Sequence, residues 1–146
     1  MAKKRIRPIA LGLIEHEGYL FVSKGKDSTT NQVFYRFLGG GIEFGETSEA
    51  ALVREFEEEI GAELTGIEYL GCLDNIFTLH GKPGHELIQL FRARFVDDAF
   101  YQIDQTFRLI EGDRIDQAFW LDTQKVLSQA CYLVPQSCLK YIEKVD

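Results

Sequence analysis

The sequence predicts an α/β (α+β) fold in which one amphipathic helix lies between two groups of β-strands. Apolar residues recur with helical spacing over residues 48–60, which predicts the helix. Short apolar runs bounded by glycine and polar residues occupy the segments on both sides, which predicts strands. The chain has 146 residues, a length that suits one domain with a full apolar core. We therefore expect a single domain over residues 1–146.

Three strands are expected before the helix, because short apolar runs alternate there with polar or glycine-rich segments. The first two are expected to be joined by a short connection, and the third leads into a glycine turn. The expected strands cover residues 9–14, 19–23 and 33–38, with a polar loop at residues 25–31 and the turn at Gly39, Gly40 and Gly41.

The expected helix has well-marked ends. Thr47 or Ser48 is suited to accept a free backbone N–H at the start of the helix. Glu49 in the first turn suits the positive end of the helix dipole. Gly61 follows the last helical residue and suits a left-handed C-terminal cap. These local signals predict a helix over residues 48–60.

More strands and a closing helix are expected after this point. The stretch over residues 86–96 is the most strand-like, and a glycine- and proline-containing turn precedes it. The expected elements are a β-rich run at residues 67–79, a turn at 81–84, a strand at 86–96, a mixed and loop-rich stretch at 97–114, a last strand at 118–121 and a helix at 135–145.

Three glutamates give the helix its chemical interest. Glu55, Glu58 and Glu59 follow an i, i+3, i+4 pattern, which puts three carboxylates on one helix face. Carboxylate oxygens are the ligands that hard divalent cations prefer. Acidic residues are disfavoured in the last turn by the helix dipole, and a bound cation relieves that conflict. The alternative interpretation is a solvated acidic face that binds nothing.

The segment from Gly40 to Ala62 resembles the Nudix box, written G-x5-E-x7-R-E-U-x-E-E-x-G-U with U apolar. All seven fixed positions of that motif are filled. One departure precedes the box, where Leu38 stands in place of the proline found in many family members. The fixed positions are Gly40, Glu46, Arg54, Glu55, Glu58, Glu59 and Gly61.

This resemblance implies an α/β/α sandwich with a mixed central sheet and a metal-dependent pyrophosphohydrolase. Such enzymes cleave a nucleoside diphosphate linked to another moiety by attack of water on phosphorus, with Mg²⁺ or Mn²⁺ as cofactor. The substrate classes include nucleoside triphosphates, nucleotide-sugars, ADP-ribose and dinucleotides. The alternatives are a non-catalytic Nudix-fold module that senses a nucleotide, and an unrelated structural protein with an acidic helix.

The resemblance also implies roles for individual residues. Arg54 and Glu46 resemble the pair that supports the site, in which the arginine orients carboxylates. Gly61 resembles the glycine that closes the helix. The metal-binding positions are Glu55, Glu58 and Glu59, with Glu55, Glu58 and Arg54 counted as catalytic, and the turn that approaches metal and phosphate is Gly39, Gly40 and Gly41.

Residues outside the box are candidates on chemical grounds. A general base must lie within hydrogen-bond reach of the attacking water, and the box does not identify it. Besides the box glutamates, Glu86 is a candidate because it follows a glycine turn, and Glu111 and Asp98 are candidates in the later loop. A solvated side chain is the alternative for each. Arg36, just before the glycine turn, is a candidate phosphate contact or a surface charge.

Composition limits the class of partner. The net charge of −7 argues against general nucleic-acid binding but admits a small anionic substrate whose charge a metal offsets. Three cysteines without a secretion signal are typical of reduced, cytoplasmic thiols. No segment is long enough to span a membrane. The family resemblance adds the expectation of a homodimer.

Overall fold

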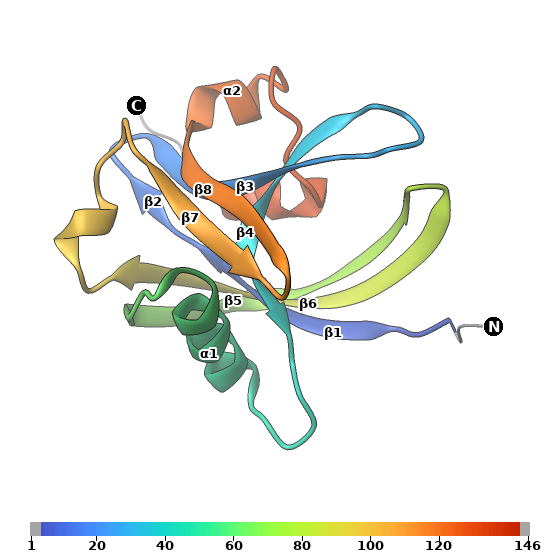
Figure 1. Cartoon of the computed structure of the whole chain (residues 1–146), viewed down its shortest axis with the longest axis horizontal. Helices are drawn as coiled ribbons and strands as arrows, with labels where there is room; N and C mark the ends of the chain where they lie inside the picture. Colours follow the sequence, from blue (N-terminus) through green and yellow to red (C-terminus); the bar gives the residue numbers. More distant parts are fainter. Residues whose placement is uncertain (1–3, 144–146) are drawn as a thin grey trace.

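The computed structural model describes residues 4–143 and contains one long helix, a large sheet and several short helical turns (Figure 1). The elements in chain order are β1 (Arg7–Leu13), β2 (Glu15–His16), β3 (Tyr19–Lys26), β4 (Val33–Gly41), α1 (Ser48–Ile60), β5 (Leu64–Leu79), β6 (Lys82–Phe95), the 3₁₀ turn η1 (Asp98–Phe100), β7 (Thr106–Glu111), β8 (Arg114–Asp122), α2 (Thr123–Leu127) and the 3₁₀ turn η2 (Gln136–Tyr141).

The sheet is mixed, as predicted. Its strand order is β5-β6-β1-β4-β3-β8-β7, with β2 paired to β3. Strand β1 runs parallel to β6, with Arg7 opposite Glu86, and antiparallel to β4. Strand β4 pairs with β3 over its first half and with β1 over its glycine end. The end of β4 therefore lies beside the centre of β1.

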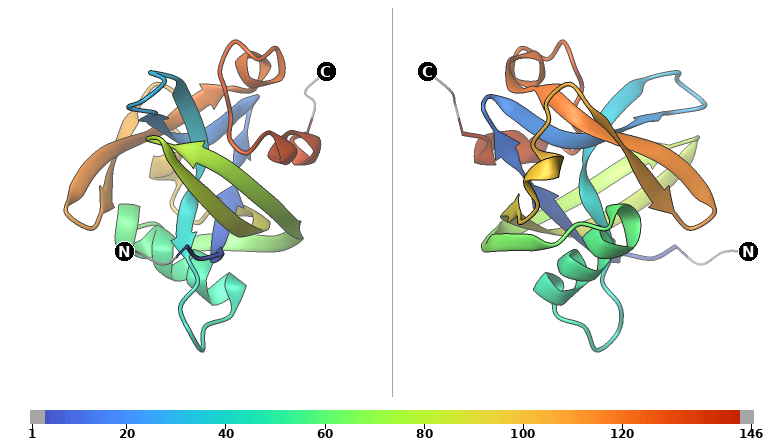
Figure 2. Two further views of the ribbon diagram at one scale, coloured as in Figure 1. Left: turned by 90° about the vertical axis from the view of Figure 1, so that its right-hand side faces the viewer. Right: turned by 60° about the vertical axis from the view of Figure 1, so that its left-hand side comes forward.

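Two apolar cores cover the two faces of the sheet, which confirms the predicted sandwich. Alternate residues of β1 point to opposite faces, so Ile9 and Leu11 enter one core and Ala10 the other. Helix α1 fills the second core with Leu52 and Phe56. The C-terminal segment with α2 and η2 covers the opposite face (Figures 1 and 2).

Helix α1 has the predicted bounds and the predicted caps. The side chain of Thr47 accepts a hydrogen bond from the backbone N–H of Ala50 at 3.1 Å. Gly61 adopts a left-handed conformation with φ of 65°, and its N–H donates to the carbonyl of Glu57. The local sequence signals were sufficient here because both caps lie within one turn of the helix ends.

The predicted glycine turn is wrong, because Gly39–Gly41 form the end of β4 and pair with β1. Gly39 has φ of +147°, and a Cβ atom built on it would lie 1.9 Å from the carbonyl oxygen of Ala10. Glycine is thus required where the two backbones approach closely, and the same residue type that suggests a turn serves here inside a strand.

Four further expectations differ from the structure, the first being the turn at residues 81–84, where β6 already begins at Lys82. The stretch at residues 97–114 contains β7, which pairs with β8 in a hairpin, and the last strand is correspondingly longer than predicted. The expected C-terminal helix is a 3₁₀ turn over Gln136–Tyr141, and its last expected residues, 144 and 145, lie outside the described residues. Helix α2 was not predicted. In residues 4–143 no helix has the length and apolar character needed to cross a membrane.

Candidate active site

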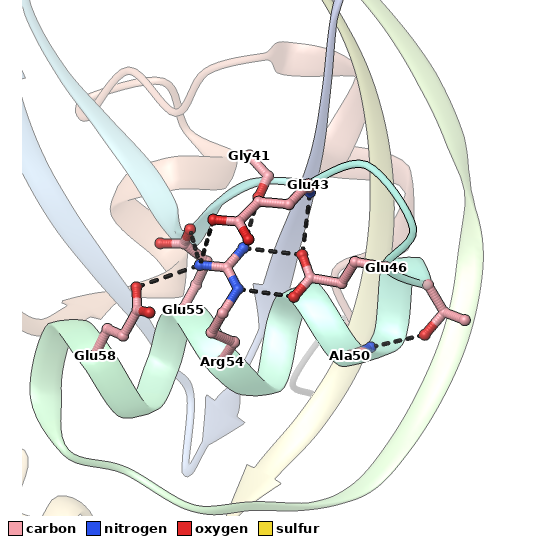
Figure 3. Close-up of polar contacts among 8 residues, drawn as sticks. Gly41, Glu43, Glu46, Ala50, Arg54, Glu55 and Glu58 are labelled. Carbon is pink, nitrogen blue, oxygen red and sulfur yellow. Dashed lines mark hydrogen bonds and ion pairs between the residues drawn. The ribbon is translucent and has the colours of Figure 1, made fainter.

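Arg54 of α1 connects the helix to the loop and strand that precede it (Figure 3). Its Nε donates to Oε2 of Glu46 at 2.7 Å, and its Nη2 donates to Oε1 of the same carboxylate at 2.9 Å. Nη2 also donates to the carbonyl oxygen of Gly41 at 2.9 Å. This two-pronged pairing fixes the guanidinium plane and supports the role predicted for Arg54 and Glu46.

The other side of the same guanidinium faces the helix carboxylates. Nη1 of Arg54 donates to Glu55 at 2.9 Å and to Glu58 at 3.2 Å, as Figure 3 shows. The hydrogen bonds from Arg54 are the main reason why the pKa of Glu46 falls to about 2. The bond with Glu46 in turn raises the pKa of Arg54. One cation therefore neutralises several carboxylates that would otherwise repel one another.

Glu59 lies apart from this pairing and points inward. It is 7% exposed, although it is one residue from the exposed Glu58. Burial, a hydrogen bond with Glu55 and the negative charge of Glu111 raise the pKa of Glu59 to about 9, with smaller contributions from Glu55 and Glu58. The predicted acidic face therefore has two parts. Glu55 and Glu58 are paired with Arg54, whereas no positively charged group contributes to the pKa of the buried Glu59.

Two of the glycines at the end of β4, Gly40 and Gly41, bring backbone into direct contact with these side chains. A Cβ atom on Gly40 would lie 2.5 Å from the carboxylate of Glu55. The Glu55 carboxylate therefore rests on the backbone of Gly40, beside the carbonyl of Gly41 that Arg54 binds. Only a residue without a side chain leaves that space, so glycine is required at position 40.

A cavity of about 160 Å³, called here the central cavity, lies between α1, β1, β4 and β6. Glu59 lines it from the helix, and Glu111 reaches it from the β7–β8 hairpin, which Figure 1 shows extending toward α1. Asp98, in contrast, is exposed in η1 and does not line the cavity. The structure thus brings one of the two late-loop candidates to the box glutamates.

Two other predicted candidates are paired with each other. Nη2 of Arg36 donates to Oε1 of Glu86 at 2.8 Å, and Nδ2 of Asn75 donates to the same oxygen at 3.1 Å. Glu86 is 3% exposed, and it lines the central cavity together with Arg36. Sequence reasoning missed Asn75, because its importance depends on the pairing of β5 with β6, where it stands opposite Glu86.

The residues fit a hard divalent cation in chemistry. Within residues 4–143, no group of three or more histidine, cysteine, aspartate or glutamate side chains is arranged to hold a metal ion. Arg54 hydrogen-bonds both Glu55 and Glu58 in this structure. The donors are nevertheless carboxylate oxygens beside a glycine backbone, and a buried acid among like charges is stabilised by an added cation.

Comparison with curated proteins finds relatives that act on nucleotides. The chain is 31% identical over 86 residues to the NAD-capped RNA hydrolase NudC of Pseudomonas aeruginosa, a match that covers 59% of this chain. It is 38% identical over 78 residues to the 8-oxo-dGTP diphosphatase of Proteus vulgaris, covering 53% of this chain and 69% of that protein. The match spans only 26% of the length of the NAD-capped RNA hydrolase.

Solved structures and a family model agree on the fold. A NUDIX hydrolase from Nitrosomonas europaea superposes with a TM-score of 0.64 at 18% identity, covering 93% of this chain and 87% of that chain. A MutT NUDIX hydrolase from Burkholderia pseudomallei gives 0.61 at 22% identity, covering 82% and 84%. The family model described as NUDIX domain matches residues 4–136. With its complete box folded onto a mixed sheet, the chain belongs to the NUDIX domain family.

Proposed function

We propose that this protein is a metal-dependent pyrophosphohydrolase that cleaves a nucleoside diphosphate linked to another moiety. The observation that carries the proposal is the cluster formed by Glu55, Glu58 and Glu59 against the glycine end of β4, beside the central cavity. The printed names of the relatives, an NAD-capped RNA hydrolase, an 8-oxo-dGTP diphosphatase and a CTP pyrophosphohydrolase, support a pyrophosphate bond as the target.

In this proposal Glu55, Glu58 and Glu59 hold Mg²⁺ or Mn²⁺. When bound, such an ion neutralises charge on the phosphoryl group and lowers the pKa of a coordinated water. Arg54 and Glu46 keep the carboxylates oriented, because the guanidinium contacts Glu46, Glu55 and Glu58 at once. Arg54 acts as a positioning residue, and Gly61 supports the helix end.

We assign the general base to Glu111 in preference to Glu86. Glu111 lines the central cavity together with Glu59, and its carboxylate makes no hydrogen bond with another group of residues 4–143. One oxygen of Glu86 already accepts hydrogen bonds from Arg36 and Asn75. These hydrogen bonds suit a role for Glu86 in holding Arg36 toward the substrate phosphates. The role of Glu86 as general base stays a prediction.

The remaining parts of the proposal concern the cellular location and the oligomeric state of the protein. All three cysteines, Cys72, Cys131 and Cys138, are free thiols in the structure. This supports the expected cytoplasmic location, where thiols stay reduced. A homodimer remains an expectation from the family resemblance, and its test is the mass of the protein measured by light scattering.

The experiment is a hydrolysis panel with Mg²⁺ or Mn²⁺ over nucleoside triphosphates, oxidised dGTP, ADP-ribose, nucleotide-sugars and dinucleotides. The variants are Glu58→Gln and, as the matched control, Glu57→Gln, an exposed neighbour on the same helix. We expect Glu57→Gln to match wild type and Glu58→Gln to lose at least about 100-fold in rate, since even residues that only orient metal ligands contribute up to about that factor.

Equal background hydrolysis by wild type and Glu58→Gln across the whole panel would contradict the enzyme proposal. If nucleotide binding were still detectable in that case, the non-catalytic sensing module would be the better description of the chain.

A further inference from the structure

A second cavity of about 410 Å³ adjoins the central cavity on its N-terminal side. It lies between residues 4–7 and the turn end of the β5–β6 hairpin. Arg7 and Glu86 line both cavities, and these two residues face each other where β1 begins to pair with β6. The two cavities are therefore neighbours that share part of their lining, and the second is called here the basic cavity.

The charge of the basic cavity is opposite to that of the protein. Its lining carries the exposed side chains of Lys4, Arg5, Arg7 and Lys82, together with His85, although the net charge of the chain is −7. Within residues 4–143 none of those four lysines and arginines forms an ion pair with a carboxylate. The acidic residue of the lining, Glu86, is already paired with Arg36. These cations are therefore available to an anionic ligand.

An aromatic ring separates this cavity from a third one. Phe77 lines the basic cavity and also a larger cavity of about 680 Å³ that contains Phe34 and Tyr132. Phe77 stands opposite Gly84 in the β5–β6 pair, and a Cβ atom on Gly84 would lie 2.3 Å from the ring. The ring therefore rests directly on the glycine backbone, which fixes it as a platform on which a base can stack.

We propose that the basic cavity binds a second nucleotide of the substrate, its phosphates held by the lysines and arginines and its base stacked on Phe77. This inference rests on the proposed function, because it names the moiety on the far side of the cleaved pyrophosphate. The substrate class is then a dinucleotide in which two nucleosides are joined through a phosphate chain. Its phosphate chain extends into the central cavity, which Arg36 and Arg7 line.

The first test measures binding without catalysis. Isothermal titration in EDTA removes divalent metal, so no probe is hydrolysed during the measurement. The probes are ADP and inorganic pyrophosphate, and the proteins are wild type, the double variant Arg5→Gln with Lys82→Gln, and Lys125→Gln. Lys125 lies exposed on α2 and lines none of the three cavities, so its variant tests the effect of losing a positive charge elsewhere on the surface.

We expect both probes to bind wild type and Lys125→Gln equally, and to bind the double variant about tenfold more weakly because charge-assisted contacts to phosphate are lost. ADP is expected to bind more tightly than pyrophosphate, and Phe77→Leu is expected to remove that preference. Equal affinity in wild type and the double variant overturns the site. A preference for ADP that survives Phe77→Leu, or no preference at all, overturns the assignment of a second nucleotide.

The second test uses metal and compares diadenosine tetraphosphate with ATP. We expect the double variant to lose about tenfold in kcat/KM for diadenosine tetraphosphate and to change little for ATP, which lacks the second nucleoside. An equal loss for both substrates overturns the proposal, since it indicates a general electrostatic effect. If wild type hydrolyses neither substrate, the dinucleotide assignment fails and the binding measurement still decides the basic cavity, whereas the proposed function fails only if the whole hydrolysis panel is negative.

Discussion

At the scale of single residues, Arg54 shows how an acidic helix face becomes compatible with folding. Its guanidinium binds Glu46 through two hydrogen bonds and reaches Glu55 and Glu58 through a third nitrogen. The same side chain binds the Gly41 carbonyl, so charge neutralisation and loop attachment depend on one group. Glu59 has no such hydrogen bond from Arg54, so its contribution to the free energy of unfolding depends on pH.

We expect the stability of the metal-free protein to depend on Glu59. Burial raises the pKa of Glu59 from its ordinary value of 4.5 to about 9, so the folded state holds a proton that the unfolded state releases. A group whose pKa is raised on folding contributes stability that is complete at pH values below its pKa in the unfolded chain. That contribution is lost as the pH rises through its pKa in the folded protein. In EDTA, the free energy of unfolding of wild type should therefore fall between those two pH values.

Urea unfolding over that pH range checks this expectation. Glu59→Gln should show a flatter dependence than wild type, because its side chain does not titrate, whereas Glu57→Gln should follow wild type. Parallel curves for wild type and Glu59→Gln would count against a raised pKa at this position.

Whether a site residue could be predicted depends on how far it lies from the others in the sequence. Glu46, Arg54 and the three glutamates were predicted because they belong to one continuous motif, and helical spacing alone places the glutamates together. Glu111 and Asn75 depend on strand pairings that bring separate hairpins to the motif. The Arg36–Glu86 pair has the same origin, since the sequence showed two isolated charges and not their contact.

At the scale of elements, helix α1 was predicted with the right bounds because its caps are local. The strands were less predictable, since the ends of a strand depend on the strand that pairs with it. The sequence indicated a turn at the glycines of β4 and a loop at β7, and both segments are strands. In β7 the alternation of Phe107 and Leu109 with polar or exposed neighbours was a usable signal, because Leu109 is the buried residue of that strand.

The N-cap of α1 provides a prediction at this scale. Replacing Thr47 by alanine removes the acceptor for the Ala50 N–H, which should cost about 1 kcal/mol. For a chain of this size that corresponds to a fall in Tm of about 2–4 °C. Scanning calorimetry of Thr47→Ala and Thr47→Ser tests it, because serine keeps the hydroxyl group. A Tm of Thr47→Ala equal to that of wild type would exclude a contribution from the cap.

At the scale of the whole molecule, the two cores on opposite faces of the sheet differ in what covers them. Helix α1 covers one, and the other depends on the C-terminal segment, where Leu133, Cys138 and Ile142 are buried. Burial raises the pKa of the Cys138 thiol to about 12. Cys72 is exposed on β5 and therefore serves as an internal reference.

Cysteine alkylation should report whether this C-terminal segment is docked. Iodoacetamide reacts with thiolate, so native protein should be labelled at Cys72 and remain unlabelled at Cys138 until urea unfolds it. Peptide mass spectrometry identifies the labelled positions. Labelling of Cys138 at the same rate with and without urea would show that the segment does not protect this face in solution.

The parallel pairing of β1 with β6 has a consequence for biosynthesis. A ribosome delivers β1 first, but one of its two neighbours in the sheet begins only at Lys82. Until then the apolar residues of β1 have no complete sheet to enter, and pairings so distant along the chain form slowly. The nascent chain must therefore avoid aggregation until β5 has been synthesised. The central cavity, which both β1 and β6 line, forms only after β6 has been added.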